Sequence, residues 1–450
     1  MKRAILLAFL LFASGALLAA RPVARWDVIP HQLAEGVFKV GVVTFHETGV
    51  EVLFTVNGKK VWKAKRATMN ERTGVVEYVY PFDASKHPDG PVTIGATVTA
   101  GDGEKFDLPD LPLYANSKKT LGSKKIAWVD AANGNEFADG SKETPVKTIA
   151  VGVRKAGDGG VVYLLPGTYD MKLIGGGKNR LYWTTVRPAP GVKREQVRVE
   201  GGRSGTEKLR FQNLDLFSNV EPGENRGLAI GEGGGTMAWF DNCVMHNLKG
   251  RTSGISKPFA NKLRAFVTGG VTTEMTFGPG AEIVRAHRID KISGEAFTGG
   301  NLLAVNVKVN DIDPAGSEIV EADLYQGFAQ RPHWTGDVIL YGIEATECRC
   351  RGIVGRQLRD AAFVDIKFQN LGNALCVTRF SQGLENVLFA RLDMVDQAWE
   401  WMRQDSGREN VWPRNVRLYD VNASKFTGYD TTDGSEGLLV ESKCDWLPAK

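Results

Sequence analysis

The sequence Phe211-Gln212-Asn213-Leu214-Asp215-Leu216 alternates apolar and polar side chains and carries a turn-forming asparagine at its third position. The pattern returns as Phe240-Asp241-Asn242-Cys243-Val244-Met245, and then at residues 305–309, 341–343, 364–366, 390–392 and 419–421. Alternation with a period of two predicts β-strands. The equivalent positions Gly342, Asp365, Arg391 and Asp420 lie 23, 26 and 29 residues apart. Repeats of this length predict a solenoid, because one coil cannot bury its apolar face alone and must stack on the next.

The repeat lengths vary, so we expect corner loops of different sizes between the strands. Parallel stacking places equivalent residues about 4.8 Å apart, which predicts polar ladders along the sides of the solenoid. We predict that this solenoid spans residues 126–440 and that a short C-terminal tail follows at residues 441–450.

The stretch that opens the predicted solenoid is distinctive. It begins with Ile126-Ala127-Trp128-Val129-Asp130, continues through Pro145-Val146-Lys147-Thr148 into a short helix at roughly residues 149–156, and ends with Pro166-Gly167-Thr168-Tyr169. This stretch resembles the opening of secreted pectin-lyase-like proteins, which are right-handed parallel β-helices with a helix over the first coil. The first coil has no neighbour beneath it, so an amphipathic helix is needed to cover its exposed core.

Residues 22–116 show short alternating segments separated by turn signals. Residues 50–56 alternate before Asn57-Gly58, and Lys60-Val61-Trp62 follows, which together predict a β-hairpin. Several strands at this spacing predict a β-sandwich, which resembles the bacterial immunoglobulin-like modules of secreted carbohydrate enzymes. A polar linker at residues 117–125 would join it to the solenoid. The predicted fold class is therefore all-β, with an N-terminal β-sandwich followed by a right-handed parallel β-helix.

The N-terminus is typical of a secretory signal peptide, predicted at residues 1–20. Lys2 and Arg3 precede an apolar run, and the small residues Ala19 and Ala20 supply a cleavage site. We therefore expect a periplasmic or secreted protein with no membrane span after cleavage. The net charge of +4 is mild and spread along the chain, which argues against a nucleic-acid partner.

The chain has five cysteines, an odd number for an exported protein. Cys348 and Cys350 lie two residues apart, where a bridge between them would be strained, and Cys243 and Cys376 fall within apolar strand patterns. We expect mostly buried free thiols. The spacing matches no zinc-binding pattern, so no cysteine metal site is predicted.

A second set of side chains recurs along the later coils. Gln326, Arg356, Arg379 and Arg403 follow similar short segments, which places them at equivalent positions in the repeat. Stacked guanidinium groups repel one another unless carboxylates lie between them, from the protein or from an anionic ligand across the coils. The column therefore predicts either a binding site for a uronate polysaccharide or a ladder of arginines that are ion-paired with acidic residues of the protein.

The longest corner insertion among these coils is at residues 327–336. It carries Arg331, His333 and Trp334, which offer a cation, a titratable imidazole and an aromatic ring for stacking on sugars. Asp323 precedes this insertion as a candidate acid or cation ligand. Trp399 and Trp401 could add further aromatic rings for stacking on sugars. The segment resembles the Asp-x-x-Gln stretch of secreted parallel β-helix proteins, although Ala322 replaces the histidine that often precedes that aspartate.

The favoured function is a polysaccharide lyase that cleaves an anionic, uronate-containing polysaccharide by β-elimination. That reaction needs a cation at the carboxylate, a base for the C5 proton and an acid at the leaving oxygen. The arginine column would supply the first, and His333 or an arginine the second; Ca²⁺ bound through Asp323 could replace the arginines. The alternatives are a non-catalytic carbohydrate-binding or cell-surface structural protein, and a glycoside hydrolase that uses Asp311, Asp313 or Asp323. The oligomeric state stays open.

Overall fold

The computed structural model describes residues 20–171, 174, 180–202, 205, 207–225, 228, 237–259, 263–319, 321–328, 334–371, 377–401, 414–427, 438–441 and 444–447. Within these ranges it describes only the backbone at residues 328, 356, 370, 377–382, 395–401, 424–427 and 438–441.

The N-terminal part is a β-sandwich. One sheet has the strand order β1 (Val23–Trp26), β3 (Val37–Phe45), β7 (Val75–Asp83), β6 (Thr68–Asn70). The other has the order β2 (Leu33–Ala34), β10 (Leu111–Ala115), β8 (Gly90–Ala100), β4 (Val50–Val56), β5 (Lys59–Ala64), with β9 (Lys105–Asp107) on β8. Asn57 and Gly58 have φ of 49° and 75° between the antiparallel strands β4 and β5, so the predicted hairpin is confirmed.

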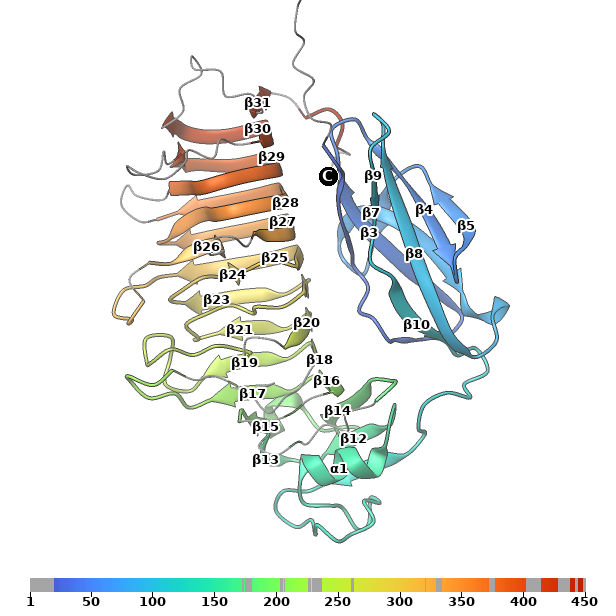
Figure 1. Ribbon diagram of the computed structural model, residues 1–450. Coiled ribbons are helices and arrows are strands. Elements are labelled where there is room, and N and C mark those ends of the chain that lie inside the picture. The colour runs from blue at the N-terminus through green and yellow to red at the C-terminus, as the bar shows by residue number, and fades with distance from the viewer. Residues whose placement is uncertain are drawn as a thin grey trace, which may run out of the picture.

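The rest of the chain winds into a right-handed parallel β-helix, whose described strands join into one sheet in chain order (Figure 1). The first half comprises β11 (Ile126–Val129), β12 (Val161–Leu164), β13 (Gly167–Asp170), β14 (Thr184–Pro188), β15 (Val197–Glu200), β16 (Glu207–Gln212), β17 (Asp215–Ser218), β18 (Met237–Asp241), β19 (Val244–Asn247), β20 (Arg264–Thr268) and β21 (Val271–Thr273). The second comprises β22 (Ile283–Arg285), β23 (Arg288–Ile292), β24 (Phe297–Thr298), β25 (Leu302–Ile312), β26 (Asp323–Phe328), β27 (Thr335–Cys348), β28 (Arg351–Asn370), β29 (Val377–Trp401), β30 (Arg414–Thr427) and β31 (Leu438–Glu441). Short 3₁₀ turns stand at η1 (Ala84–Lys86) in the sandwich and η2 (Arg194–Gln196) in the solenoid.

The repeated turn position of the sequence is a left-handed corner of the backbone. Gly342, Asp365, Arg391 and Asp420 have φ between 51° and 67°. The pairs Tyr341–Val364, Val364–Ala390 and Ala390–Tyr419 place these corners above one another in successive coils. The sequence alignment of these coils is therefore confirmed, and its physical basis is a bend that glycine, asparagine and aspartate adopt most readily.

Aromatic rings stack inside the coils, where the chain buries its main core. Phe211 and Phe240 are stacked at a centroid distance of 5.4 Å, and Phe363 and Phe389 at 5.2 Å. All four are fully buried. Because neighbouring coils place equivalent side chains about 4.8 Å apart, identical residues at one position form such ladders without changing the backbone.

Helix α1 (Ile149–Ala156) covers the first coil, as the sequence predicts. It buries Ile149, Val151, Val153 and Ala156 against the open end of the core, and the Thr148 side chain accepts a hydrogen bond from the backbone N–H of Val151 at 3.3 Å. The helix is therefore capped at its N-terminus in the usual way.

Substitution of this cap, Thr148→Ala, is expected to lower the free energy of unfolding by about 1 kcal/mol, because the Val151 N–H loses its acceptor. Denaturant titration of both proteins measures the difference. Thr252→Ala, at an exposed turn of the solenoid, is the matched control. An equal effect of the two substitutions would contradict the capping role.

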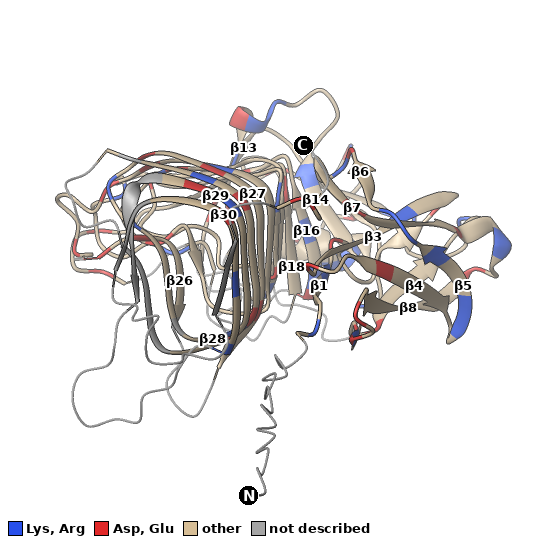
Figure 2. Cartoon of the chain, turned by 90° about the horizontal axis from the view of Figure 1, so that it is seen from above, with Lys and Arg blue, Asp and Glu red and all other residues tan. Residues whose placement is uncertain are grey.

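The sandwich lies along one side of the solenoid, as the view along the solenoid in Figure 2 shows. Apolar side chains from its first sheet pack against a second apolar column on the outside of the coils. Phe45 meets Tyr341 edge to face at 5.0 Å, and the Trp183 Nε1–H donates to the carbonyl of Pro30 at 2.7 Å. Trp446, in the C-terminal tail, packs against Tyr419 at the same interface. The two parts therefore share a continuous hydrophobic interface.

A polar cluster is buried within this interface. Asp27 accepts hydrogen bonds from the Gly41 N–H at 3.0 Å and from Asn70 Nδ2 at 3.3 Å, and it is ion-paired with Arg72. Arg285 of the solenoid donates to the backbone carbonyl of Asp27 at 2.6 Å. This cluster links one sheet of the sandwich to strand β22.

Candidate functional site

The predicted site residues come from β26, from the corner that follows it and from strands β28 and β29. Asp323 and Gln326 are fully described, and Trp334 is half-buried just before β27. For four residues only the backbone is described: Arg356, Arg379, Trp399 and Trp401. Three others lie outside the described residues: Arg331, His333 and Arg403.

The backbone register corrects the predicted arginine column. Gln326 pairs with Val354, which pairs with Arg379. Arg356 instead pairs with Phe328 and Ser381, so it is displaced by two residues from the column of Gln326 and Arg379. A shift of two residues keeps every side chain on the same side of a strand, so the hydrophobic pattern cannot distinguish the two alignments.

Asp323 is fully buried, and both of its carboxylate oxygens are engaged. Arg351 donates from Nε to Oδ1 at 2.6 Å and from Nη2 to Oδ2 at 3.0 Å, and Gln326 Nε2 donates to Oδ2 at 2.8 Å. Burial raises the pKa of Asp323, and the Arg351 pair opposes that rise. Both oxygens of Asp323 are therefore occupied within a charge-assisted network, which also holds the Gln326 amide in place.

Glu295 lies one coil before Asp323. Phe297 pairs with Tyr325, and Glu295 and Asp323 each stand two residues before those aromatics, so the two acids occupy equivalent positions in adjacent coils. Burial raises the pKa of Glu295 to about 7, and the nearby charge of Asp323 adds to the rise. Glu295 therefore changes protonation near neutral pH, as a general acid or base requires.

Glu295 lines a pocket of about 540 Å³ on the side of the solenoid. Gln326 and Lys257 also line it, and the Lys257 ammonium lies 5.3 Å from the ring centroid of Phe277. Thr298 of β24 also lines it, and the other lining residues come from the segments between strands β19 and β25: Pro258, Phe259, Leu263, Gly278, Gly280, Ala281, Glu282, Gly299, Gly300 and Asn301. The pocket thus combines the carboxyl group of Glu295, the cation of Lys257, the amide of Gln326 and the aromatic rings of Phe259 and Phe277.

Glu282 is the other acid among the described lining residues. Its two oxygens accept hydrogen bonds from Arg264, at 2.6 Å from Nε and 2.9 Å from Nη2. Such a bidentate pair stabilises the ionised carboxylate. Glu295 is therefore the lining acid best suited to proton transfer.

The raised pKa of Glu295 also predicts a pH-dependent cost to stability. The unfolded chain releases this proton near pH 4.5 and the folded chain near pH 7, so the folded state is progressively destabilised as pH rises through that window. Above pH 7 the cost approaches roughly 3 kcal/mol. Glu295→Gln removes it, so the variant should gain stability over the wild type between pH 5 and pH 8, which urea titrations at several pH values measure. A constant difference across this range would contradict the raised pKa.

The other carboxylates considered for hydrolysis are ion-paired. Asp311 lies 2.8 Å from Arg251, and Asp313 lies within 4.0 Å of both Arg251 and Arg349. His246 lies on a different side of the coils, where its Nε2 is 2.7 Å from Asp215 Oδ1. None of these six residues lines the Glu295 pocket.

Glu295 and Lys257 were missed by sequence reasoning. A signal for Glu295 was present, because Glu295-Ala296-Phe297 and Asp323-Leu324-Tyr325 share an acid two residues before an aromatic ring. Lys257 has no such signal, because it lies in a corner segment of irregular length.

The described cysteines are mostly buried, as the sequence predicts. Cys243, Cys348 and Cys350 are buried and Cys444 is half-buried, while Cys376 lies outside the described residues. Cys243, Cys348 and Cys444 are free thiols. Among the described residues, no three or more His, Cys, Asp or Glu side chains are grouped to hold a metal ion. No helix in the described ranges has both the length and the apolar character needed to cross a bilayer.

Comparison with known proteins identifies no relative of this chain. No protein-family model matches it, and it matches neither a curated protein nor a solved structure.

Proposed function

We propose that the protein is a secreted polysaccharide lyase of the pectin-lyase-like β-helix type, with an immunoglobulin-like N-terminal module. Its substrate would be a uronate-containing polysaccharide. The observation that carries the proposal is a carboxyl group, Glu295, with a pKa of about 7 in an open pocket that also holds a lysine.

β-Elimination uses these groups as follows. Lys257 neutralises the uronate carboxylate and so acidifies the C5–H bond, and ionised Glu295 takes the C5 proton. The electrons of the C5–H bond form the C4=C5 double bond, while the bond between C4 and the glycosidic oxygen breaks. That oxygen takes a proton from solvent, and Gln326 offers an amide for a sugar hydroxyl. The predicted arginines on β28 and β29 would pair with further carboxylates of the substrate, but the proposal does not depend on them.

The same geometry favours a lyase over a glycoside hydrolase. Hydrolysis needs two carboxyl groups on opposite sides of the scissile bond. Asp323 is buried and held by Arg351, and Glu282 is held by Arg264, so each is committed to an ion pair. A single available carboxyl group is sufficient for elimination, because the substrate's own carboxylate stabilises the developing carbanion.

The test is incubation with a panel of acidic polysaccharides, with and without Ca²⁺, while ultraviolet absorbance of unsaturated uronate products is recorded. A rise in absorbance is expected. New reducing ends without that absorbance would indicate a hydrolase. Binding without either product would indicate a carbohydrate-binding or structural protein.

A further inference from the structure

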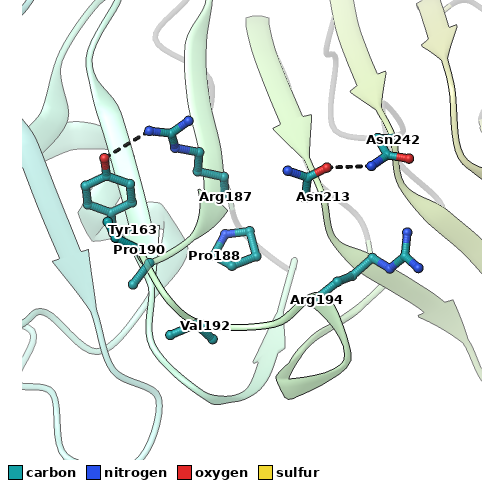
Figure 3. A pocket seen from close by; sticks show the side chains of 9 residues that line it. Tyr163, Arg187, Pro188, Pro190, Val192, Arg194, Asn213 and Asn242 are labelled. Carbon is teal, nitrogen blue, oxygen red and sulfur yellow. Dashed lines mark hydrogen bonds between the residues drawn. The ribbon is translucent and has the colours of Figure 1, made fainter.

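A second groove lies over the first coils of the solenoid and shares no lining residue with the Glu295 pocket. Its volume is about 600 Å³, within the range of small-molecule sites. Its lining residues are Tyr163 and Arg187 on strands β12 and β14, Asn213 and Asn242 at the corners after β16 and β18, and the segment that carries Arg194 (Figure 3).

Two guanidinium groups line this groove, and its described lining residues include no acid. Arg187 donates from Nη2 to the Tyr163 hydroxyl at 2.9 Å and from Nη1 to Gln212 Oε1 at 3.3 Å, and both partners are neutral. Arg194 has only its neighbour Glu195, at 3.5 Å and largely exposed, among the described acids. An exposed pair of this kind contributes little, so both positive charges are available to an anion.

The remaining lining supplies polar and apolar contacts for a sugar ring. Asn242 Nδ2 donates to Asn213 Oδ1 at 2.8 Å, which leaves the Asn213 amide N–H₂ and the Asn242 carbonyl for neighbouring hydroxyl groups. Pro188, Pro190 and Val192 form an apolar wall suited to the C–H face of a pyranose. Two cations, an amide donor beside an amide acceptor, and an apolar wall match a sugar that carries a carboxylate.

The register of the coils extends this surface beyond the groove. Trp128 pairs with Tyr163, and Tyr163 pairs with Arg187, so the three side chains follow one another up the solenoid. The two aromatic rings lie 5.0 Å apart, and Arg187 lies 5.2 Å from the Tyr163 ring centroid. This ladder holds the Arg187 guanidinium in place before a ligand arrives, which lowers the entropy cost of binding.

We infer that this groove is a second binding site for anionic sugars, remote from the Glu295 pocket, which holds another part of the same polysaccharide. The anionic and sugar-like chemistry is read from the groove, whereas the choice of uronate rests on the proposed function. Tethering a polymer at two sites raises the local concentration of its scissile bonds at the first.

The test uses the full-length protein carrying Glu295→Gln and Lys257→Ala, so that the ligand is not cleaved and the first pocket lacks its cation, with calorimetric titration of a panel of uronate tetrasaccharides. Arg187→Ala and Arg194→Ala, each added to this background, are expected to weaken binding by about tenfold or more, because each removes a charge-assisted hydrogen bond. Arg194 stands on a surface turn, so its variant should fold even if Arg187→Ala does not. Arg154→Ala, on the exposed face of α1, is the charge-matched control and should bind normally.

The outcomes separate this inference from the proposed function. Loss of binding in the two groove variants, but not in Arg154→Ala, supports the site even if the wild type cleaves nothing. Conversely, cleavage of polymer by an Arg187→Ala, Arg194→Ala protein at the wild-type rate, with unchanged tetrasaccharide affinity, overturns the site and leaves the lyase proposal standing. Failure of every tetrasaccharide to bind also overturns it.

Discussion

Glu295→Gln is expected to lower the rate of polysaccharide cleavage by about 10²- to 10⁴-fold, the usual contribution of a positioned general base. Glutamine keeps the size and polarity of the side chain but cannot accept the C5 proton. The residue is only 7% exposed, so the change should leave the pocket's shape intact. Initial rates of unsaturated product formation, measured for both proteins at saturating substrate, give the ratio.

The pH dependence provides an independent check of this role. A base with a pKa of about 7 is protonated and inactive below that pH, so the wild-type rate should fall as pH drops through neutrality. The matched control is Glu344→Gln, an exposed carboxylate on β27, which should retain the wild-type rate and profile. If Glu295→Gln retains the wild-type profile, the base must be another group.

Arg285→Ala is expected to destabilise the protein by about 3–5 kcal/mol, because it removes one partner of a buried charge cluster. The Arg285 side chain is only 7% exposed, and burial lowers its pKa to about 10, so it stays charged at neutral pH. Without Arg285, Arg72 is the remaining cation that pairs with the buried negative charge of Asp27. Burial raises the pKa of Glu77, the second acid in the cluster, well above its usual value, and the negative charge of Asp27 adds to this rise.

Denaturant unfolding at neutral pH measures this effect. Arg288→Ala is the matched control, because that arginine lies on the next strand with a largely exposed side chain, and it should cost no more than about 0.5 kcal/mol. In a double-mutant cycle, the effects of Asp27→Asn and Arg285→Ala should not add, because both residues belong to the same buried cluster. Equal midpoints for Arg285→Ala and Arg288→Ala would show that the cluster does not hold the two parts together.

Local sequence signals were sufficient to predict much of the architecture. The period-two alternation, the left-handed corners at Gly342 and Asp365, the Asn57-Gly58 hairpin and the capping helix all depend on residues close together in the chain. These features rest on backbone sterics and on burial of one face of each strand, which a short stretch of sequence already records.

Other features depend on which coils and surfaces meet, and these were decided by tertiary structure. Val305, Tyr341 and Val364 have the pattern of core residues, yet they form an outer column that the sandwich covers, because periodicity cannot distinguish one buried face from another. Arg356 is displaced by two residues from the predicted column of Gln326 and Arg379 for a similar reason, because both alignments have the same alternation of apolar and polar residues.

The candidate site shows most clearly which features the sequence determined and which only the tertiary structure decided. Asp323 and Gln326 were found from the sequence because they lie on a regular strand of the repeat. Glu295 has a pKa near 7 only because the folded coils remove it from water beside Asp323, and Lys257 reaches the same pocket from a corner of irregular length. The repeat in the sequence therefore determined the coils, whereas the stacking of their unequal corners decided the chemistry, because desolvation and charge proximity exist only once distant segments are packed together.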